Sequence, residues 1–278
     1  MAELGDYAQV LAAQPDSLTL RRGQTADVVL DRTRRLAWRF PRSADSCRHL
    51  PEQCATLVAV RKAGLPAPEV VGAEFSGGPG TAHVCMRLLV GVALGDAANL
   101  LSSTSALRLT ADLASLLNRL WAATPEGLPA SKRAWHQQWR DMEQRARKSL
   151  LPLLSGAAAA QALHDLQTAV TTASTSPTAF IHGDLGGENL LVQPEDGQLV
   201  GVLDWDTAGV GDTAVDLAAL RATLPRSVWT LLVDRVDGSD SMLCRADAYS
   251  ATFGLQEALL GVADGDADAV HRGLSGYS

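Results

Sequence analysis

Three oxygen-bearing side chains lie in one stretch of the sequence at intervals that could support metal-assisted chemistry. Asp184 precedes Asn189 by five positions, and Asp204 follows the apolar run Leu199–Leu203. An amide oxygen and a carboxylate suit Mg²⁺, which also keeps waters and takes phosphate oxygens as ligands. A carboxylate beside such a site can accept the proton of an attacking hydroxyl group. The residue types therefore indicate phosphoryl transfer, with Asp184 as the base and Asn189 and Asp204 as metal ligands.

A β-hairpin is the element that would bring the two metal ligands together. A Pro-Glu-Asp-Gly turn separates two apolar runs, so Leu190–Gln193 and Gln198–Leu203 should pair as antiparallel strands. Counting outward from the turn places Asn189 opposite Val202, with Asp204 two residues further along the same face. The spacing predicts that the amide and the carboxylate converge at the open end of the hairpin.

Each of these residues also has an ordinary structural interpretation. An Asp in a loop often accepts a hydrogen bond from its own backbone, so His-Gly-Asp alone is weak evidence of catalysis. The combination of Asp184, Asn189 and Asp204 around one turn favours the catalytic interpretation, because D-x-x-x-x-N is the interval of a kinase catalytic loop. His182 is interpreted as a structural residue that braces the loop through a hydrogen bond.

The motifs around this site resemble the signature of the aminoglycoside phosphotransferase family, whose fold is similar to that of protein kinases. They are His182-Gly183-Asp184-Leu185, Gly201-Val202-Leu203-Asp204-Trp205, and Gly211-Asp212 followed by Asp216-Leu217-Ala218. Further segments are similar to the members that modify the basic peptide antibiotics viomycin and capreomycin: Gly186-Gly187-Glu188, Asp204-Trp205-Asp206, Thr252–Leu259 and Gly273–Tyr277. The resemblance covers nearly the whole chain and is strongest from Phe180 onward.

The resemblance implies roles for individual positions. Asp184 would be the catalytic base, and Asn189 and Asp204 would hold magnesium. Asp212 and Asp216 would be structural carboxylates, with Asp216 stabilising the loop that follows the metal site. The implied reaction is transfer of the γ-phosphoryl group of ATP to a hydroxyl group of a cationic antibiotic. A viomycin- or capreomycin-like peptide is the favoured acceptor, and an aminoglycoside or a macrolide is the alternative.

The first part of the chain departs from the family pattern at the phosphate-binding position. The family uses a strand lysine paired with a glutamate on the next helix. None of the three lysines lies on an expected strand of this region, so Arg39 is expected to take the position, with Glu52 as its partner. Arginine can bind phosphate through two N–H groups and stays charged. The alternative for Arg39 is a solvated charge on a strand.

Two further segments would complete the nucleotide site. Gly23, Gln24 and Thr25 form a short loop whose backbone amides could cover the phosphates, although it supplies one glycine where protein kinases have three. Backbone groups of the strand around Met86 and Leu88 would hold the base. Such contacts leave adenine and guanine, and hence ATP and GTP, as alternatives.

The expected elements form two lobes. Short strands at Ser17–Leu20, Asp27–Leu30 and Leu36–Phe40 precede a helix between Arg48 and Ala63 and a strand at Ala82–Leu89. These elements indicate an α+β fold with two lobes, and the family resemblance implies that this fold is protein-kinase-like. A small N-terminal lobe with an antiparallel sheet (1–90) would bind the nucleotide. After a hinge near 86–91, a larger and mostly helical C-terminal lobe (91–278) would carry catalysis and substrate binding.

Helical periodicity dominates the second lobe. Leu113, Leu116, Leu117, Leu120 and Trp121 form one apolar stripe. Residues 134 to 172 read as two helices separated by residues 151–156, with Trp135 and Trp139 one turn apart. A tryptophan pair at that spacing is more often core packing than a ligand platform.

Charge is distributed unevenly along the chain. Residues 1–90 hold 11 basic and 9 acidic side chains, and residues 181–278 hold 5 and 16, so the net charge changes from +2 to −11. An acidic region repels nucleic acid and attracts a cationic ligand, although it could also be a solvated surface. The candidate substrate contacts are Glu188, Asp206, Asp237, Asp240, Glu257 and Trp139.

Other protein classes are disfavoured by what the sequence lacks. The first twenty residues have no basic start and no long apolar run, which predicts a cytoplasmic protein without a membrane span, and a monomer is expected. The four cysteines have no zinc-site spacing, and neither G-x-S-x-G nor a Gly-Lys dipeptide occurs. Two alternatives remain: a metabolic kinase acting on choline, homoserine or a sugar amine, and an inactive kinase-like module that sequesters a drug.

Overall fold

A computed structural model describes residues 3–23, 25–97, 101–123, 127, 134–236 and 240–277. Contacts divide the described chain into two compact units that interleave in sequence. The first comprises the residues up to Asp112, Gly127 and Glu188–Thr207, and the second comprises the remaining described residues. The hairpin strands around residues 190–202 thus belong to the first unit. The division into lobes at residues 90 and 91 stays a prediction.

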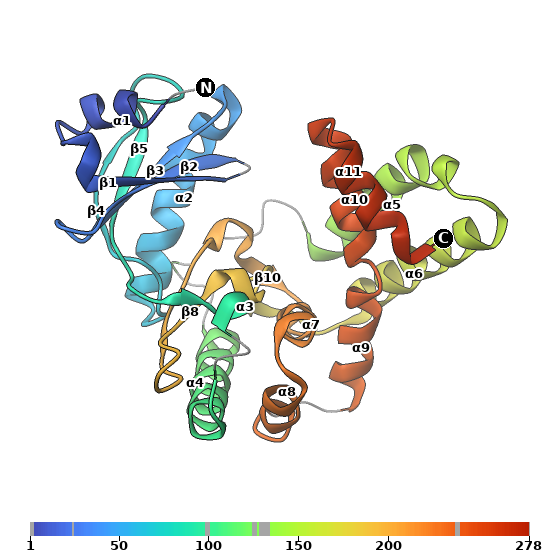
Figure 1. The fold of residues 1–278 in the computed structure, drawn as a ribbon. Helices are drawn as coiled ribbons and strands as arrows, with labels where there is room; N and C mark the ends of the chain where they lie inside the picture. Colours follow the sequence, from blue (N-terminus) through green and yellow to red (C-terminus); the bar gives the residue numbers. More distant parts are fainter. Residues whose placement is uncertain are drawn as a thin grey trace. The chain divides into compact units, whose positions relative to one another are not determined.

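A five-stranded antiparallel sheet forms most of the first unit, with strand order β1-β2-β3-β5-β4 (Figure 1). Its strands are β1 (Leu18–Arg22), β2 (Ala26–Asp31), β3 (Leu36–Pro41), β4 (Val70–Glu74) and β5 (His83–Arg87). The expected meander of three strands and the later strand are confirmed. Strand β4 was not expected, because it is an edge strand whose residues are mostly exposed and show no apolar alternation.

Two helices, α1 (Leu4–Val10) and α2 (Ala44–Lys62), cover the sheet. Tyr7 of α1 packs with Trp38 and Phe40 of β3 on one face of the sheet. Leu50 of α2 packs with Val84 of β5 in a separate cluster. Helix α2 begins four residues before the expected Arg48, because Ser43 caps it by accepting a hydrogen bond from the Ser46 amide at 3.0 Å.

A second, three-stranded sheet in the first unit contains the hairpin. It has the order β6-β8-β9, from β6 (Val92–Ala93), β8 (Leu190–Val192) and β9 (Leu199–Val202). The sequence prediction of a hairpin at these positions is confirmed. Helix α3 (Leu94–Ala97) follows β6, and α4 (Ser103–Ala122) carries the expected stripe, in which Leu113, Leu116, Leu117 and Leu120 are fully buried.

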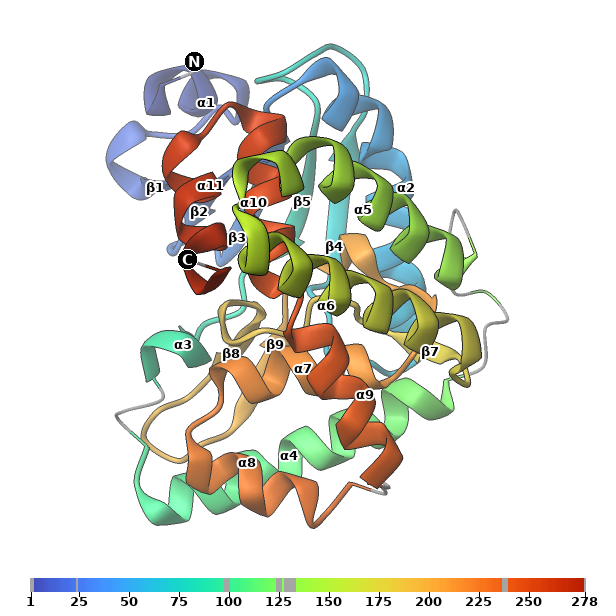
Figure 2. The ribbon, with the colours of Figure 1, turned by 90° about the vertical axis from the view of Figure 1, so that its right-hand side faces the viewer.

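The second unit is mainly helical (Figure 2). It contains the part of α4 from Leu113 on. Its other helices are α5 (Trp135–Ser149), α6 (Gly156–Thr175), α7 (Ala214–Thr223), α8 (Arg226–Val233), α9 (Asp240–Ser250), α10 (Phe253–Asp264) and α11 (Ala267–Leu274). Helices α5 and α6 are the pair expected between residues 134 and 172, and they share a buried cluster with α10. Strands β7 (Ala179–Ile181) and β10 (Gly209–Gly211) form a short antiparallel ribbon.

Two properties of the whole described chain bear on the protein class. None of the helices that the structure describes combines the length and the hydropathy needed to span a bilayer. All four cysteines lie among the described residues, and each is a free thiol.

Candidate active site

At the open end of the hairpin Asn189 lies opposite Leu203, the residue before Asp204, with a register one residue different from the expected one. Val192 pairs with Leu199 as counting from the turn predicts, but beyond a bulge Leu190, not Asn189, lies opposite Val202. The bulge inserts Val200 as an extra residue into β9, which shifts all later pairs by one. The Leu203 amide consequently donates to the Asn189 carbonyl at 2.8 Å.

A tight turn follows the hairpin and carries two carboxylates. Asp204 has a φ of 51°, a left-handed conformation that few non-glycine residues adopt. The 3-10 turn η5 (Trp205–Thr207) comes next. The Trp205 ring is buried, and its indole N–H donates to the Val202 carbonyl at 2.9 Å. This bond anchors the turn to β9, so the positions of Asp204 and Asp206 are determined by a fixed piece of backbone.

Arg39 of β3 reaches this turn from the sheet. Its Nη1 donates to Asp206 Oδ1 at 3.1 Å and its Nη2 donates to Asp206 Oδ2 at 2.5 Å, while Nη1 lies 3.5 Å from Asp204 Oδ1. The Arg39 side chain is 15% exposed, against 27% for Asp206 and 49% for Asp204. The alternative of a solvated strand charge is therefore wrong for Arg39, which is bound to two carboxylates.

The same group of charges shifts the ionisation of its members. Burial disfavours the charged Arg39 guanidinium, but Asp206 and Asp204 outweigh it and raise the pKa of Arg39 above its ordinary value. Burial also raises the pKa of the Asp206 carboxyl, against the opposing effect of Arg39, and the neighbouring Asp204 adds to the rise. Two carboxylates sharing one guanidinium leave net negative charge at this turn, which favours a bound cation.

Helix α2 contributes Gln53 to this group of side chains. The described partners of Arg39 are Asp206, Asp204 and Thr25, and the α2 side chain that joins them is Gln53, which donates to Asp206 Oδ2 at 2.8 Å. Helical spacing could have identified Gln53, because it lies three residues after the buried Leu50 and four before the buried Leu57. Glu52 is exposed, and its pairing with Arg39 stays a prediction.

The short loop between β1 and β2 lies beside Arg39. Arg39 Nη2 donates to the Thr25 hydroxyl at 3.5 Å. The Arg42 amide donates to the Thr25 carbonyl at 3.0 Å, and Arg42 Nη1 donates to the Gly23 carbonyl at 2.6 Å. A Cβ atom at Gly23 would lie 2.6 Å from the Ala26 carbonyl oxygen, so only glycine fits there. Gln24, also predicted to bind nucleotide, lies outside the described residues.

The predicted base-binding segment follows β5. Met86 is paired on both sides, with Ala37 of β3 and Val70 of β4. The Leu88 amide donates to the Arg35 carbonyl at 2.9 Å, which uses its N–H group within the protein. A base would then have to bind through other backbone groups of this segment, so the contributions of Met86 and Leu88 stay predictions.

In the second unit, the loop of Asp184 is held by a buried carboxylate. Asp216 of α7 accepts hydrogen bonds from the Gly183 amide at 2.9 Å, the His182 amide at 3.3 Å and the Trp121 indole at 3.2 Å. Burial raises the pKa of Asp216, while His182 and these donors oppose the rise. His182 Nδ1 accepts from the Asp184 amide at 3.2 Å and His182 is fully buried, which confirms its bracing role. Asp184 itself is exposed.

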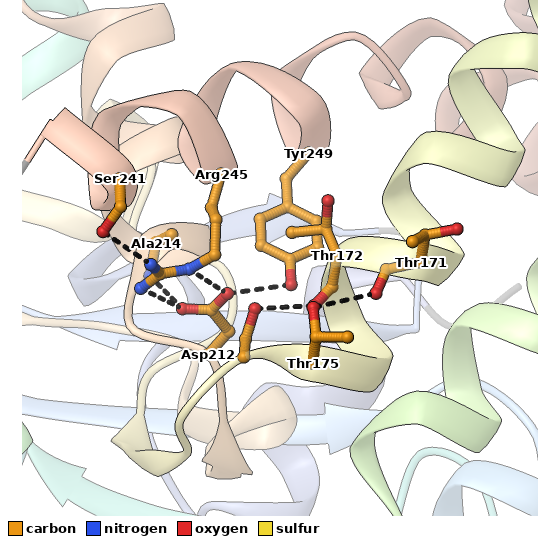
Figure 3. Close-up of polar contacts among 9 residues, drawn as sticks. Thr171, Thr172, Thr175, Asp212, Ala214, Ser241, Arg245 and Tyr249 are labelled. Atoms are coloured by element: carbon orange, nitrogen blue, oxygen red, sulfur yellow. Dashed lines mark hydrogen bonds and ion pairs between the residues drawn. The ribbon is translucent and has the colours of Figure 1, made fainter.

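A second buried carboxylate fixes the start of α7 (Figure 3). Asp212 accepts from Arg245 Nε at 2.8 Å, the Tyr249 hydroxyl at 2.9 Å and the Ala214 amide at 3.0 Å. Arg245 and Tyr249 lie one helical turn apart on α9. Sequence reasoning did not identify these two partners, although their spacing of four places them on one face of a helix.

The predicted substrate contacts have different surroundings. Asp206 is bound to Arg39 and Gln53, as described above. Glu257 accepts from Arg272 Nε at 3.0 Å. Trp139 is 7% exposed, with its ring centroid 4.7 Å from that of Tyr249, which favours core packing over substrate contact. Glu188 and Asp240 are exposed, and Asp237 lies outside the described residues.

The candidate metal ligands fit a hard cation that takes further ligands from outside the protein. Asn189 and Asp204 belong to the first unit and Asp184 to the second. Among the described residues there is no cluster of three His, Cys, Asp or Glu side chains that could hold a metal by themselves. One amide oxygen and one carboxylate at the same end of a hairpin are the donor set expected for Mg²⁺ bound together with phosphate.

Comparisons with known proteins agree on the family and the fold. The family model described as "Phosphotransferase enzyme family" matches residues 18–249. Viomycin phosphotransferase of Streptomyces vinaceus is 32% identical over 259 residues, which is 90% of this chain and 86% of that protein.

Two solved structures share the fold at low identity. The GDP and kanamycin complex of APH(2")-IIia has a TM-score of 0.84 at 19% identity and covers 99% of this chain and 97% of its own. The streptomycin-ATP-APH(2")-IIa ternary complex has a TM-score of 0.70 at 15% identity, covering 100% and 97%. The expected α+β fold is thereby confirmed.

Proposed function

We propose that this chain, which belongs to the phosphotransferase enzyme family, transfers the γ-phosphoryl group of ATP to a hydroxyl group of a cationic antibiotic. The observation that carries the proposal is the end of the β8–β9 hairpin, where Asn189 pairs with the residue before Asp204. Asp184 precedes Asn189 by five residues, which limits the distance between their Cα atoms to about 18 Å or less in any arrangement.

Each residue has a defined part in the reaction. The Asp184 carboxylate accepts the proton of the acceptor hydroxyl group. At the same time the oxygen of that hydroxyl group forms a bond to the γ-phosphorus. The bond between that phosphorus and the bridging oxygen breaks, and ADP leaves. Asn189 and Asp204 would hold Mg²⁺, which would supply positive charge to the transferring phosphoryl group. Arg39 would bind the phosphates, and the Gly23–Thr25 loop would cover them.

A viomycin- or capreomycin-like peptide is the proposed acceptor. The relative that matches most of this chain is named for viomycin. These antibiotics are basic, and residues 181–278 carry a net charge of −11, which would attract a cation. Glu188, Asp237 and Asp240 are the proposed contacts, since Asp206 and Glu257 already bind arginine side chains.

An aminoglycoside with GTP is the second candidate. The structural neighbour with the higher TM-score of the two was solved with GDP and kanamycin, and the other was solved with ATP and streptomycin. Both nucleotides are therefore included in the test.

The test is a panel of acceptors with radiolabelled ATP or GTP and Mg²⁺. It contains viomycin, capreomycin, kanamycin, a macrolide, choline and homoserine. We expect label to move to viomycin or capreomycin, with a gain of one HPO₃ group in the mass of the drug. Transfer only to choline or homoserine would show a metabolic kinase. Binding of a drug without Mg²⁺-dependent transfer would show an inactive module.

We propose a monomer with a nucleotide-binding lobe (1–90) and a catalytic lobe (91–278), working in the cytoplasm, where ATP is available. Nucleic acid is not a proposed partner, because the acidic C-terminal part repels phosphate backbones.

A further inference from the structure

We propose that Asp206, assisted by Gln53, is the positioning partner of the phosphate-binding Arg39, in the place that the family pattern gives to Glu52. The inference rests on the proposed function, because it assigns Arg39 to the phosphates. It adds two residues to the nucleotide site, and it assigns Asp206 to Arg39 instead of to the antibiotic.

Arg39 and Asp206 form a pair with a defined geometry. Arg39 presents two nitrogens to the two oxygens of Asp206, at 3.1 and 2.5 Å, in the parallel two-bond arrangement that holds a guanidinium in one orientation. Both side chains are mostly withdrawn from solvent, with 15% and 27% exposure. Exposed surface ion pairs contribute little to stability, but the pair of Arg39 and Asp206 is partly buried and makes two hydrogen bonds, so it does not belong to that class.

Helix α2 contacts the same carboxylate. Gln53 Nε2 donates to Asp206 Oδ2, the oxygen that also accepts from Arg39 Nη2. Asp206 is therefore fixed from a strand and from a helix, and its own turn is anchored by Trp205. Gln53 lies one residue after Glu52 on α2, and it takes the role that the family pattern gives to a glutamate on this helix. It reaches Arg39 through Asp206 because its neutral amide can donate to a carboxylate.

The two carboxylates of this turn, Asp206 and Asp204, have different surroundings. Asp206 makes three described hydrogen bonds with Arg39 and Gln53. Asp204 is more exposed and lies 3.5 Å from Arg39 Nη1. When Asp206 neutralises the guanidinium, Asp204 remains available for a cation. Without Asp206, Arg39 would turn to Asp204 and compete with Mg²⁺ for that carboxylate.

The experiment measures equilibrium binding of a fluorescent ATP analogue at several Mg²⁺ concentrations, without any acceptor. Asp206→Asn should raise the dissociation constant about tenfold, because a charge-assisted pair is lost, and should increase the Mg²⁺ requirement. Gln53→Ala, which keeps the ion pair between Arg39 and Asp206, should raise the dissociation constant about threefold. Glu52→Gln should change the dissociation constant less than twofold. Arg108→Gln, which removes the exposed ion pair to Asp196 in the same unit, is the control and should leave the dissociation constant unchanged.

Double substitution shows whether Asp206 acts through Arg39. In an Arg39→Met background, adding Asp206→Asn should have almost no further effect on nucleotide binding. Should Asp206→Asn unfold the protein, Asp206→Glu and Gln53→Ala provide the same comparison, with thermal unfolding as the check on folding.

Other outcomes overturn the inference. If Glu52→Gln lost nucleotide binding while Asp206→Asn kept it, Glu52 would be the positioning partner of Arg39. An effect of Asp206→Asn confined to the KM of the antibiotic, and unchanged by Arg39→Met, would make Asp206 a substrate contact. A wild-type protein that binds no nucleotide would also overturn it. Nucleotide binding with the predicted coupling, but no transfer to any antibiotic, would contradict only the proposed function.

Discussion

The Asp216 carboxylate lies 2.9 Å from the backbone nitrogen of Gly183, inside the second unit, where Asp216 has no exposure to solvent. Asp216 also accepts from the His182 amide and from the Trp121 indole. The backbone just before Asp184 is therefore held by a buried carboxylate on a helix. A carboxylate that accepts several N–H bonds keeps its loop in one conformation, which a proposed catalytic base requires.

Substitution of Asp216 should affect catalysis more than nucleotide binding. Asp216→Asn keeps the shape of the side chain but turns an NH₂ group toward N–H donors. This should lower the free energy of unfolding by about 1–3 kcal/mol and lower kcat strongly. Denaturant titration and steady-state kinetics measure the two effects. Trp121→Phe, which removes one donor and leaves the loop amides bonded, is the matched comparison. Unchanged kcat in a destabilised Asp216→Asn protein would restrict Asp216 to stability.

Asp184→Asn should abolish most of the turnover. Loss of a general base costs about a hundred- to ten-thousand-fold in rate, while the phosphate-binding residues of the first unit are untouched. Kinetics with the preferred antibiotic measure kcat, and the binding assay for the ATP analogue measures whether nucleotide affinity survives. Near-normal rates in this variant would remove Asp184 from the mechanism.

The Asp212 network should contribute strongly to stability. Arg245→Met would leave the fully buried Asp212 carboxylate without its cation, which should cost about 3 kcal/mol in the free energy of unfolding. Tyr249→Phe removes one hydrogen bond to the same carboxylate and should cost about 1.5–3 kcal/mol. Arg221→Gln, which breaks the exposed pair with Asp247, should cost less than about 1 kcal/mol. Equal losses in all three variants would contradict a special role for Asp212.

Alkaline pH should destabilise the native state through its three tyrosines. Burial, with the adjoining Asp27, raises the pKa of Tyr7 from 10.0 to about 12, and burial with Asp212 and Asp165 raises the pKa of Tyr249 and Tyr277 further. The folded state thus holds these protons more tightly than the unfolded state. Their stabilisation is complete below pH 10 and is lost as the pH rises toward 12 and above.

A spectrophotometric titration measures this effect. Phenolate absorbance of the native protein should appear later than that of the denatured protein, together with unfolding. Tyr7→Phe should remove the contribution with the lowest pKa of the three. Native phenolate absorbance that rises with the ordinary tyrosine pKa would contradict the burial of these hydroxyl groups.

The sequence by itself determined the elements that have strong local signals. The three strands before Arg42 are short runs bounded by turn residues, and the Leu113–Leu120 stripe repeats with the helical period, so each pattern identified its element. The turn at residues 194–197 was identified by its residue types. The residues proposed for catalysis were identified for the same reason, because Asp184, Asn189 and Asp204 lie at intervals that follow from one loop and one hairpin.

Only the tertiary structure decided which side chains meet across long sequence separations. Arg39 and Asp206 are 167 residues apart, and no local pattern connects them. A bulge at Val200 shifted the hairpin register by one, which counting from the turn does not predict. Helical phase placed Gln53, and not Glu52, on the face of α2 that contains Leu50 and Leu57. Local periodicity depends on neighbouring residues, whereas pairing of charges depends on which faces the packed sheet and helices bring together.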